Sequence, residues 1–269
     1  MKLSIFGATG FIGQNFCKRF PNHVLIPKHI VSPKTKNILY FISTSHDYNI
    51  YEDLKLDVET NLLLLCKVLE KCKKKDLVFN YISTMNVYGL QENLPINEQS
   101  YCNPEGLYAI TKKCAEDIII TFCKTFDVNY RILRLCNVLG MHDKISTKKN
   151  SITWMINQLK LGKNIDLYNG GEVFKEVMYI DDVCDAINLV CQKGNKNEIY
   201  NIGSGEAMTL KKIIEESKRI LNSPSKITIK NNIQRSSHSI KKNFWLDTSK
   251  LNSLGFEKKF SLYKIIKEI

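Results

Sequence analysis

The chain has 269 residues, of which 43% are hydrophobic and 25% charged, as in ordinary globular proteins. This composition excludes a disordered chain, a collagen-like fibre and a small disulfide-rich scaffold, and no run approaches the roughly 18 apolar residues of a membrane span. The length allows one large domain or two closely joined ones. Gly7 comes too early for a signal peptide's apolar core, so we expect a cytoplasmic protein.

The net charge is +12, from 39 Lys and Arg against 27 Asp and Glu. A basic surface can attract nucleic acid, anionic membranes or small anions. The lysine run at residues 71–75 lacks the interleaved aromatic side chains of a single-strand binding platform. We therefore expect a solvated lysine-rich surface, no nucleic-acid partner and no membrane insertion.

The nine cysteines form no Cys-x-x-Cys pair, and the five histidines do not cluster with them. Structural zinc sites need clustered ligands, and an apolar neighbourhood lets a reduced thiol pack as a small hydrophobe. We expect reduced cysteines and no metal site.

The first motif follows a short apolar strand at residues 2–6. It reads Gly7-Ala8-Thr9-Gly10-Phe11-Ile12-Gly13 and leads into a helical pattern over residues 14–20. Gly7 permits a tight turn, Gly10 lets the backbone approach a pyrophosphate, and Gly13 lets the helix pack closely on the sheet. Strand, glycine turn and helix together predict a nucleotide-binding loop.

The next predicted strand, residues 23–26, runs into Pro27-Lys28-His29. A dinucleotide site usually has an acid about 20 residues after the loop, which binds the adenosine ribose. No acid occurs between residues 14 and 46. Lys28, or alternatively His29 or Lys34, could instead meet a 2′-phosphate, which favours NADP(H) over NAD(H).

A buried strand is predicted at residues 76–82, ending in Ser83 and Thr84, and a helix at residues 104–116. Tyr108 and Lys112 lie four residues apart on that helix and so share one face. A neighbouring cation stabilises a phenolate, so such a tyrosine can exchange a proton with a carbonyl or alcohol. The hydroxyl of Thr84 could bind the same oxygen.

The order of these motifs resembles that of the extended short-chain dehydrogenases/reductases. Later segments agree with the resemblance: Arg134–Gly140, Val177–Val183, Tyr200–Gly205 and Leu251–Phe256. The chain is identified as a member of the NAD-dependent epimerase/dehydratase family, which acts on nucleotide sugars. Many members dimerise through the helix that carries the tyrosine, so the resemblance implies a homodimer.

The resemblance also implies site residues. The cofactor would be bound by Gly7, Gly10, Phe11, Ile12, Gly13, Lys28, Tyr108 and Lys112. The catalytic residues would be Thr84, Tyr108 as acid/base, and Lys112, which also binds the nicotinamide ribose. The substrate would contact Thr84, and its diphosphate Asn137 and Arg235, the last on weaker spacing.

The implied fold is a Rossmann-type doubly wound parallel sheet with a smaller C-terminal lobe. Residues 1–140, with a return near 175–205, would bind the dinucleotide, and residues 141–174 and 206–269 would bind the substrate. The chain is short before residues 37–43, where the family carries another strand–helix segment. Asp57 stands at a family asparagine position, and Lys175-Glu176 replaces the family Arg-Asp.

Met85 and Asn86 follow Thr84 where family dehydratases carry acidic residues, which argues against a dehydratase. The missing ribose acid and the short adenosine side favour an NADP(H)-dependent reductase of a nucleotide-linked 4-ketosugar, in surface-glycan biosynthesis. The alternative is a nucleotide-sugar 4-epimerase with tightly bound NAD. A third reading is a non-catalytic relative that binds dinucleotide or RNA.

Overall fold

A computed structural model describes residues 1–45, 49–73, 76–141, 143, 151–230 and 243–269. Its centre is a parallel sheet of six strands in the order β10-β5-β4-β3-β1-β2. The strands are β1 (Leu3–Phe6), β2 (Val24–Ile26), β3 (Asn37–Tyr40), β4 (Val78–Thr84), β5 (Asn129–Leu135) and β10 (Glu198–Ile202). Most are near-continuous apolar runs, as expected for strands covered on both faces. The predicted Rossmann-type sheet is confirmed.

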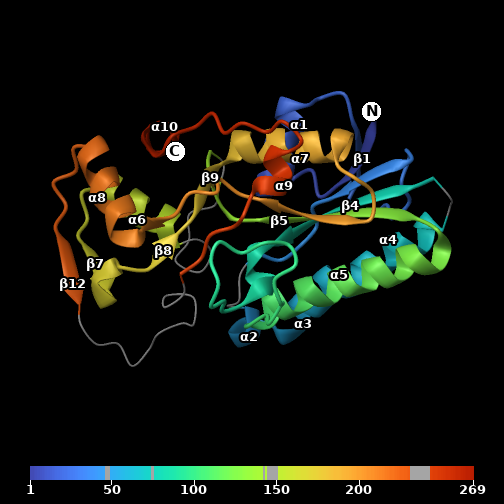
Figure 1. The fold of residues 1–269 in the computed structure, drawn as a ribbon, viewed down its shortest axis with the longest axis horizontal. Coiled ribbons are helices and arrows are strands. Elements are labelled where there is room, and N and C mark those ends of the chain that lie inside the picture. Colours follow the sequence, from blue (N-terminus) through green and yellow to red (C-terminus); the bar gives the residue numbers. More distant parts are fainter. Residues whose placement is uncertain (46–48, 74–75, 142, 144–150, 231–242) are drawn as a thin grey trace.

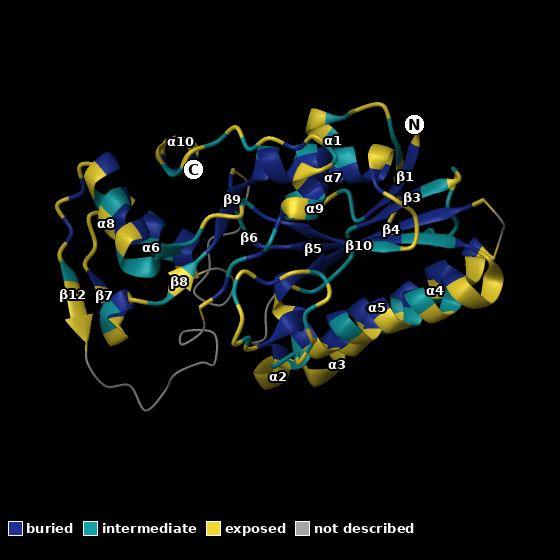
Figure 2. Cartoon of the chain, in the orientation of Figure 1, coloured by how far each residue is buried: buried dark blue, intermediate teal, exposed yellow. Residues whose placement is uncertain are grey.

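Helices cover both faces of this sheet (Figure 1). On one face lie α1 (Phe11–Arg19) and α7 (Ile180–Lys193), and on the other α4 (Leu64–Leu69) and α5 (Leu107–Phe126). Successive side chains of a strand point to opposite faces, so Ile5 joins the core under α1 while Phe6 joins the core under α5. Figure 2 shows the strands and the inner sides of these helices as buried.

Short helical segments surround α4 and β4. They are α2 (Asn49–Glu52), α3 (Leu54–Val58), the π-helical turn η1 (Glu59–Leu63), and the 3₁₀ turns η2 (Glu70–Cys72) and η3 (Met85–Tyr88). The segments α3, η1, α4 and η2 follow one another directly before β4.

The connection from β2 to β3 is the loop 27–36, which holds neither a helix nor a strand. The hydroxyl of Ser4 in β1 accepts hydrogen bonds from the backbone amides of Lys34 and Thr35, both at 2.8 Å. Ile30 and Val31 pack against the core on the α5 side. An irregular loop thus covers part of a sheet face, and the shortened segment predicted from the sequence is confirmed.

The far end of the long axis, away from β1 and α4, carries smaller elements (Figure 1). They are α6 (Ser151–Lys160), α8 (Leu210–Ile220), η4 (Asn169–Gly171), the strand pair β7 (Ile165–Tyr168) and β12 (Ile227–Lys230), and the pair β8 (Phe174–Lys175) and β11 (Met208–Thr209). Between this end and the sheet lie β6 (Asn137–Leu139) and β9 (Val177–Tyr179), which pair with each other. Of the C-terminal helices, α9 (Ser249–Asn252) packs against β10 and α10 (Leu262–Glu268) packs against α8. Ile156 of α6 belongs to the same apolar core as Leu3 of β1, so that core is continuous between the two ends.

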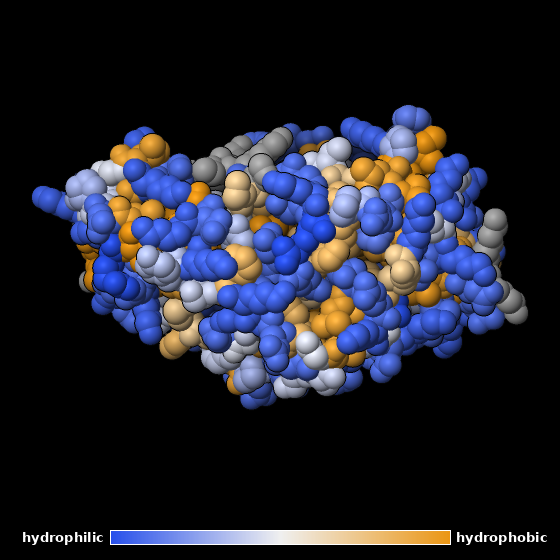
Figure 3. Space-filling view, turned by 90° about the horizontal axis from the view of Figure 1, so that it is seen from above, coloured by the Kyte–Doolittle hydropathy of each residue, from blue (hydrophilic) through white to orange (hydrophobic). Residues whose placement is uncertain are grey.

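Seen from above, the surface is mainly hydrophilic, with apolar side chains in separate patches (Figure 3). Among the described helices, none combines the length and the apolar character needed to cross a membrane.

Candidate active site

The glycine loop between β1 and α1 requires glycine at two positions for steric reasons. Gly7 has a φ of +82°, and a Cβ there would lie 2.9 Å from the amide nitrogen of Ile42. At Gly13 a Cβ would overlap the carbonyl oxygen of Gly7, so only glycine lets the first turn of α1 pack against the end of β1. These contacts agree with the turn and the close helix packing expected from the sequence.

Gly10 immediately precedes α1 and leaves the loop backbone open. A Cβ at Gly10 would meet one atom within 4 Å, the Gly7 carbonyl oxygen at 3.6 Å. Phe11 and Ile12 form the first turn of α1 and pack, half-buried, against the core. The positive end of the helix dipole therefore lies beside uncrowded backbone, a combination that suits a phosphate.

Lys28 lies at the same edge of the sheet as the glycine loop. In the parallel pair β1–β2, Phe6 is opposite Ile26, so Gly7 and Lys28 follow adjacent strands at their carboxyl ends. The amide of Ile30 donates to the carbonyl oxygen of Pro27 at 2.9 Å, which closes a turn around Lys28 and leaves its side chain exposed. A ligand lying across these two strand ends would meet a cation.

Thr84 is the last residue of β4 and is almost fully buried. Its Oγ1 accepts a hydrogen bond of 3.3 Å from the amide of Asn86 and so caps η3. Met85, which follows, is buried, and Asn86 is exposed. Neither of these two side chains carries an acidic group, so the residues that directly follow Thr84 supply no carboxyl.

Lys112 of α5 reaches the carboxyl end of β4. Its Nζ donates a 2.6 Å hydrogen bond to the carbonyl oxygen of Ile82, two residues before Thr84, and lies 4.1 Å from the ring centroid of Tyr81. Burial lowers the pKa of Lys112 to about 7, and the carboxylate of Glu116 opposes that effect. The structure therefore brings Lys112 to the strand end that carries Thr84.

Tyr108 lies one turn before Lys112 on the same helix. Burial, followed by the Glu116 carboxylate and the proximity of Tyr108, raises the pKa of the Tyr81 phenol well above its ordinary value. Lys112 thus contacts the Tyr81 ring, and Tyr108 interacts electrostatically with the Tyr81 phenol. Lys112 therefore contacts β4 directly, and Tyr108 precedes it by one turn on the same helix.

A buried ionic network begins one turn after Lys112 on α5, and no role for its members was predicted from the sequence. Glu116 and Arg134 form a two-point ion pair, with Nη2–Oε2 at 2.6 Å and Nε–Oε1 at 3.1 Å. The hydroxyl of Ser83 donates to Glu116 Oε1 at 2.5 Å, and the Arg134 guanidinium lies 4.6 Å from the ring centroid of Tyr88. The network connects α5 to β4 and β5. The sequence feature that could have indicated this network is Glu116, four residues after Lys112 and so on the same helix face.

A second polar network fixes the start of α5 from the other side. Asn61 of η1 donates to the hydroxyl of Thr111 at 2.9 Å, and that hydroxyl donates to the carbonyl oxygen of Tyr108 at 3.0 Å. Asp57, fully buried, accepts hydrogen bonds from Thr44, Asn49 and Asn61. Asp57 and Asn61 therefore support the helical turn that carries Tyr108.

Asn137 begins β6, directly after the carboxyl end of β5. Its side-chain amide donates to the backbone carbonyl oxygen of Glu176 at 2.9 Å. Arg235, the other residue expected to bind the diphosphate, lies outside the described residues. Among the described residues, no group of three or more His, Cys, Asp or Glu side chains could hold a metal ion.

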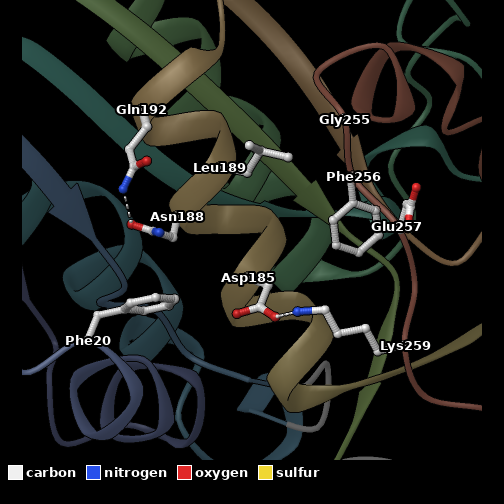
Figure 4. A pocket seen from close by; sticks show the side chains of 9 residues that line it. All are labelled: Phe20, Asp185, Asn188, Leu189, Gln192, Gly255, Phe256, Glu257 and Lys259. Atoms are coloured by element: carbon white, nitrogen blue, oxygen red, sulfur yellow. Dashed lines mark hydrogen bonds and ion pairs between the residues drawn. The ribbon is translucent and has the colours of Figure 1, made fainter.

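A separate hollow of about 340 Å³ lies on the outer side of α7 (Figure 4). Phe20, Leu189 and Phe256 contribute apolar surface, and Asp185 forms an ion pair with Lys259 at 2.9 Å along one side. None of the predicted site residues lines it. This hollow is therefore distinct from the strand edge that carries Tyr108 and Lys112.

A glycine loop at the first strand of a parallel sheet, with a tyrosine–lysine pair on the helix packed against β4, two strands away, is typical of nucleotide-binding α/β proteins of the oxidoreductase type. The sequence model of the NAD-dependent epimerase/dehydratase family matches residues 28–203. The chain belongs to this family, which comprises NAD(P)-dependent enzymes that modify nucleotide sugars. The resemblance to the extended short-chain dehydrogenases/reductases is thereby confirmed.

Two similar sequences come from proteins with different activities. A dTDP-D-glucose 4,6-dehydratase of Dictyostelium discoideum is 29% identical over 62% of this chain, and the match spans only 41% of that relative's length. A dTDP-4-dehydro-6-deoxyglucose reductase of Escherichia coli is 26% identical over 81% of this chain and 68% of that relative's length.

Solved structures share the fold over almost the whole chain. A UDP-glucose 4-epimerase of Thermotoga maritima, solved with UDP-glucose, has a TM-score of 0.87 at 21% identity, covering 99% of this chain and 96% of its own. The RMD protein of Pseudomonas aeruginosa, solved with NADPH, has a TM-score of 0.85 at 19% identity, and the match covers 99% of this chain and 97% of that one.

Proposed function

We propose that the chain is an NADP(H)-dependent reductase of a nucleotide-diphosphate-linked 4-ketosugar, acting in surface-glycan biosynthesis. The observation that carries this proposal is the 2.6 Å hydrogen bond from Lys112 Nζ to the Ile82 carbonyl oxygen, which joins the helix of Tyr108 to β4 two residues before Thr84. The relative named as a dTDP-4-dehydro-6-deoxyglucose reductase supports the reaction class.

The residues present fit a nicotinamide dinucleotide. The loop backbone at Gly10 has room on its outer side that a Cβ would begin to fill, and the first turn of α1 points its amide end there. Phe11 and Ile12 extend the same turn. Lys28, in place of an acid after β2, would pair with a 2′-phosphate, which is why we favour NADP(H) over NAD(H).

The chain's own groups would then complete the reduction. Bound NADPH supplies the hydride that the keto carbon gains. The phenol of Tyr108 gives its proton to the sugar oxygen, and the hydroxyl of Thr84 donates a hydrogen bond to the same oxygen. Lys112, when charged, binds the nicotinamide ribose and stabilises the phenolate that remains on Tyr108.

Substrate recognition completes the proposal. Residues 1–140 with 175–205 would bind the dinucleotide, and residues 141–174 and 206–269 the nucleotide sugar. Asn137 and Arg235 would contact the diphosphate. The homodimer and the cytoplasmic location stay predictions.

The test is the loss of NADPH absorbance when the purified protein meets a panel of nucleotide-linked 4-keto-6-deoxysugars. We expect consumption with one base and sugar class, and slower consumption with NADH than with NADPH. If none of them is reduced and the protein instead carries NAD through purification and interconverts a nucleotide sugar and its C4 epimer, the reductase assignment is wrong and the epimerase is correct.

A further inference from the structure

Glu176 is a fully buried carboxyl group at the junction between the central sheet and the smaller elements. It lies between β8 and β9, outside the tyrosine–lysine site. Burial raises its pKa to about 7, against the effect of several hydrogen bonds that lower it. The carboxyl group is contacted from two distant parts of the chain, the loop after β10 and the C-terminal segment.

Both side-chain oxygens of Glu176 accept hydrogen bonds from backbone amides. Oε1 accepts from the amide of Gly205 at 2.7 Å and from the hydroxyl of Ser204 at 3.2 Å. Oε2 accepts from the amide of Leu246 at 2.9 Å. One carboxylate thus hydrogen-bonds both to the loop after β10 and to the C-terminal segment, which forms a parallel β-bridge with β8 at Phe244.

The backbone beside Glu176 is shaped around it. A Cβ at Gly203 would overlap Glu176 Oε1, so glycine is needed there for the carboxylate to approach the loop. The carbonyl oxygen of Glu176 accepts the hydrogen bond from Asn137. Ile202 is opposite Leu135 in the sheet, so the loop at Gly203 and the segment at Asn137 leave the same carboxyl edge together. Ligands of open α/β sheets bind at that edge.

We propose that Glu176 is a positioning residue for the diphosphate of the nucleotide sugar, acting through Asn137 and the loop 203–205. This inference rests on the proposed function, because Asn137 binds a diphosphate only in that proposal. The side chain of Glu176 is buried behind these groups, so it orients the backbone and the Asn137 amide that would face the ligand and does not touch the ligand itself.

The test compares Glu176→Gln with Glu172→Gln in the full chain. Glu172 is a nearby glutamate whose side chain is 67% exposed and forms one long ion pair, 3.7 Å, with Lys211. Calorimetry with UDP, dTDP, GDP, CDP and ADP finds the diphosphate that the wild type binds, and NADPH fluorescence gives the cofactor Kd. Hydrogen exchange measures the amides of Gly205 and Leu246 directly.

We expect Glu176→Gln to weaken nucleoside-diphosphate binding about tenfold, to leave the NADPH Kd within about twofold, and to speed exchange at Gly205 and Leu246. Glu172→Gln should change none of the three. Equal diphosphate affinity in Glu176→Gln and wild type, or an equal loss of diphosphate and NADPH binding, would overturn the inference while leaving the proposed function intact.

A wild type that binds none of the five diphosphates overturns the proposed function, and the inference with it. Should Glu176→Gln fail to fold, Gly203→Ala gives a second route, because its Cβ displaces the same carboxylate. The same pattern of diphosphate and NADPH affinities then decides the outcome.

Discussion

Lys112 donates its hydrogen bond to the carbonyl oxygen of Ile82 across the contact between α5 and β4. The bond fixes the ammonium relative to the strand end that carries Thr84, because Thr84 lies only two residues beyond Ile82. The fold therefore sets the position of the Lys112 ammonium at this strand end, which the Tyr–Lys spacing alone could not have specified.

The first prediction concerns Tyr108. In Tyr108→Phe, the proton that the phenol would give to the substrate oxygen is lost, so kcat should fall by about 10²–10⁴-fold while the NADPH Kd stays nearly unchanged. Tyr101→Phe is the control, since Tyr101 is 79% exposed. Stopped-flow absorbance measures the turnover rate, and fluorescence titration measures the NADPH Kd. Near-normal turnover in Tyr108→Phe would remove the proposed mechanism.

The second prediction concerns the pH dependence of stability. Burial lowers the pKa of Lys112 to about 7, so between pH 7 and its unfolded value of 10.5 the unfolded chain binds more protons at this site. Stability from this group therefore rises with pH across that window, by up to about 1.4 kcal/mol per pH unit. Lys112→Met should lack this contribution.

Urea unfolding of wild type and Lys112→Met over pH 7–10.5 measures the difference directly. Taking the difference removes the titration of other groups common to both proteins. Lys113→Met is the matched control, because Lys113 forms a partly exposed ion pair with Asp117. A constant stability difference between Lys112→Met and wild type across the window would contradict the burial of a titrating amine.

The third prediction concerns the buried pair of Glu116 and Arg134. Glu116→Gln leaves the Arg134 charge without its buried counter-ion, so the free energy of unfolding should fall by about 3–5 kcal/mol. The double variant Glu116→Gln/Arg134→Met should recover part of that loss. Chemical unfolding of the single and double variants gives the coupling. Additive losses would show that the two charges do not stabilise each other.

The fourth prediction separates two glycines of one loop. Gly13→Ala places a Cβ on the Gly7 carbonyl oxygen and should destabilise the fold by about 1–3 kcal/mol. Gly10→Ala should cost less than about 1 kcal/mol but weaken NADPH binding about tenfold, because its Cβ stands where the phosphate would lie. Thermal melts and NADPH titrations report each effect. Normal NADPH affinity in Gly10→Ala would exclude this loop as the cofactor site.

The fifth prediction concerns cofactor preference. Lys28→Ala should weaken NADPH binding about tenfold and leave NADH binding unchanged, since only NADPH has a 2′-phosphate. Lys36→Ala is the control: Lys36 precedes β3 at the opposite, amino edge of the sheet and lies 3.7 Å from Asp76. Competition titrations with both cofactors measure the ratio. An equal effect of Lys28→Ala on NADPH and NADH would refute the preference.

Local patterns predicted the framework of the fold well. The strand at residues 2–6, the glycine loop and the helix bearing Tyr108 are all present, but the helix predicted at residues 104–116 extends over Leu107–Phe126. Short apolar runs and glycine turns are local signals, so one stretch of sequence is enough to recognise them. The short connection before β3 was predicted from the small number of residues between the second and third strands.

The buried polar pairs were not predictable in the same way. Ser83 meets Glu116 from 33 residues away, and Glu176 meets Leu246 from 70 residues away. Periodicity indicates which side chains face inward, but the partner of an inward-facing charge depends on the packing of whole helices and strands. The role of Asn61 in supporting Tyr108 depends in the same way on how η1 packs against α5.

Both outer strands of the central sheet are protected from pairing with a further strand. β2 has only three residues and is followed at once by Pro27, which has no amide hydrogen to donate. On the opposite side, Lys250 of α9 donates to the carbonyl oxygen of Ile199 in β10 at 2.7 Å. Neither edge strand therefore presents a long row of unpaired backbone amides and carbonyls, which disfavours edge-to-edge aggregation of folded molecules.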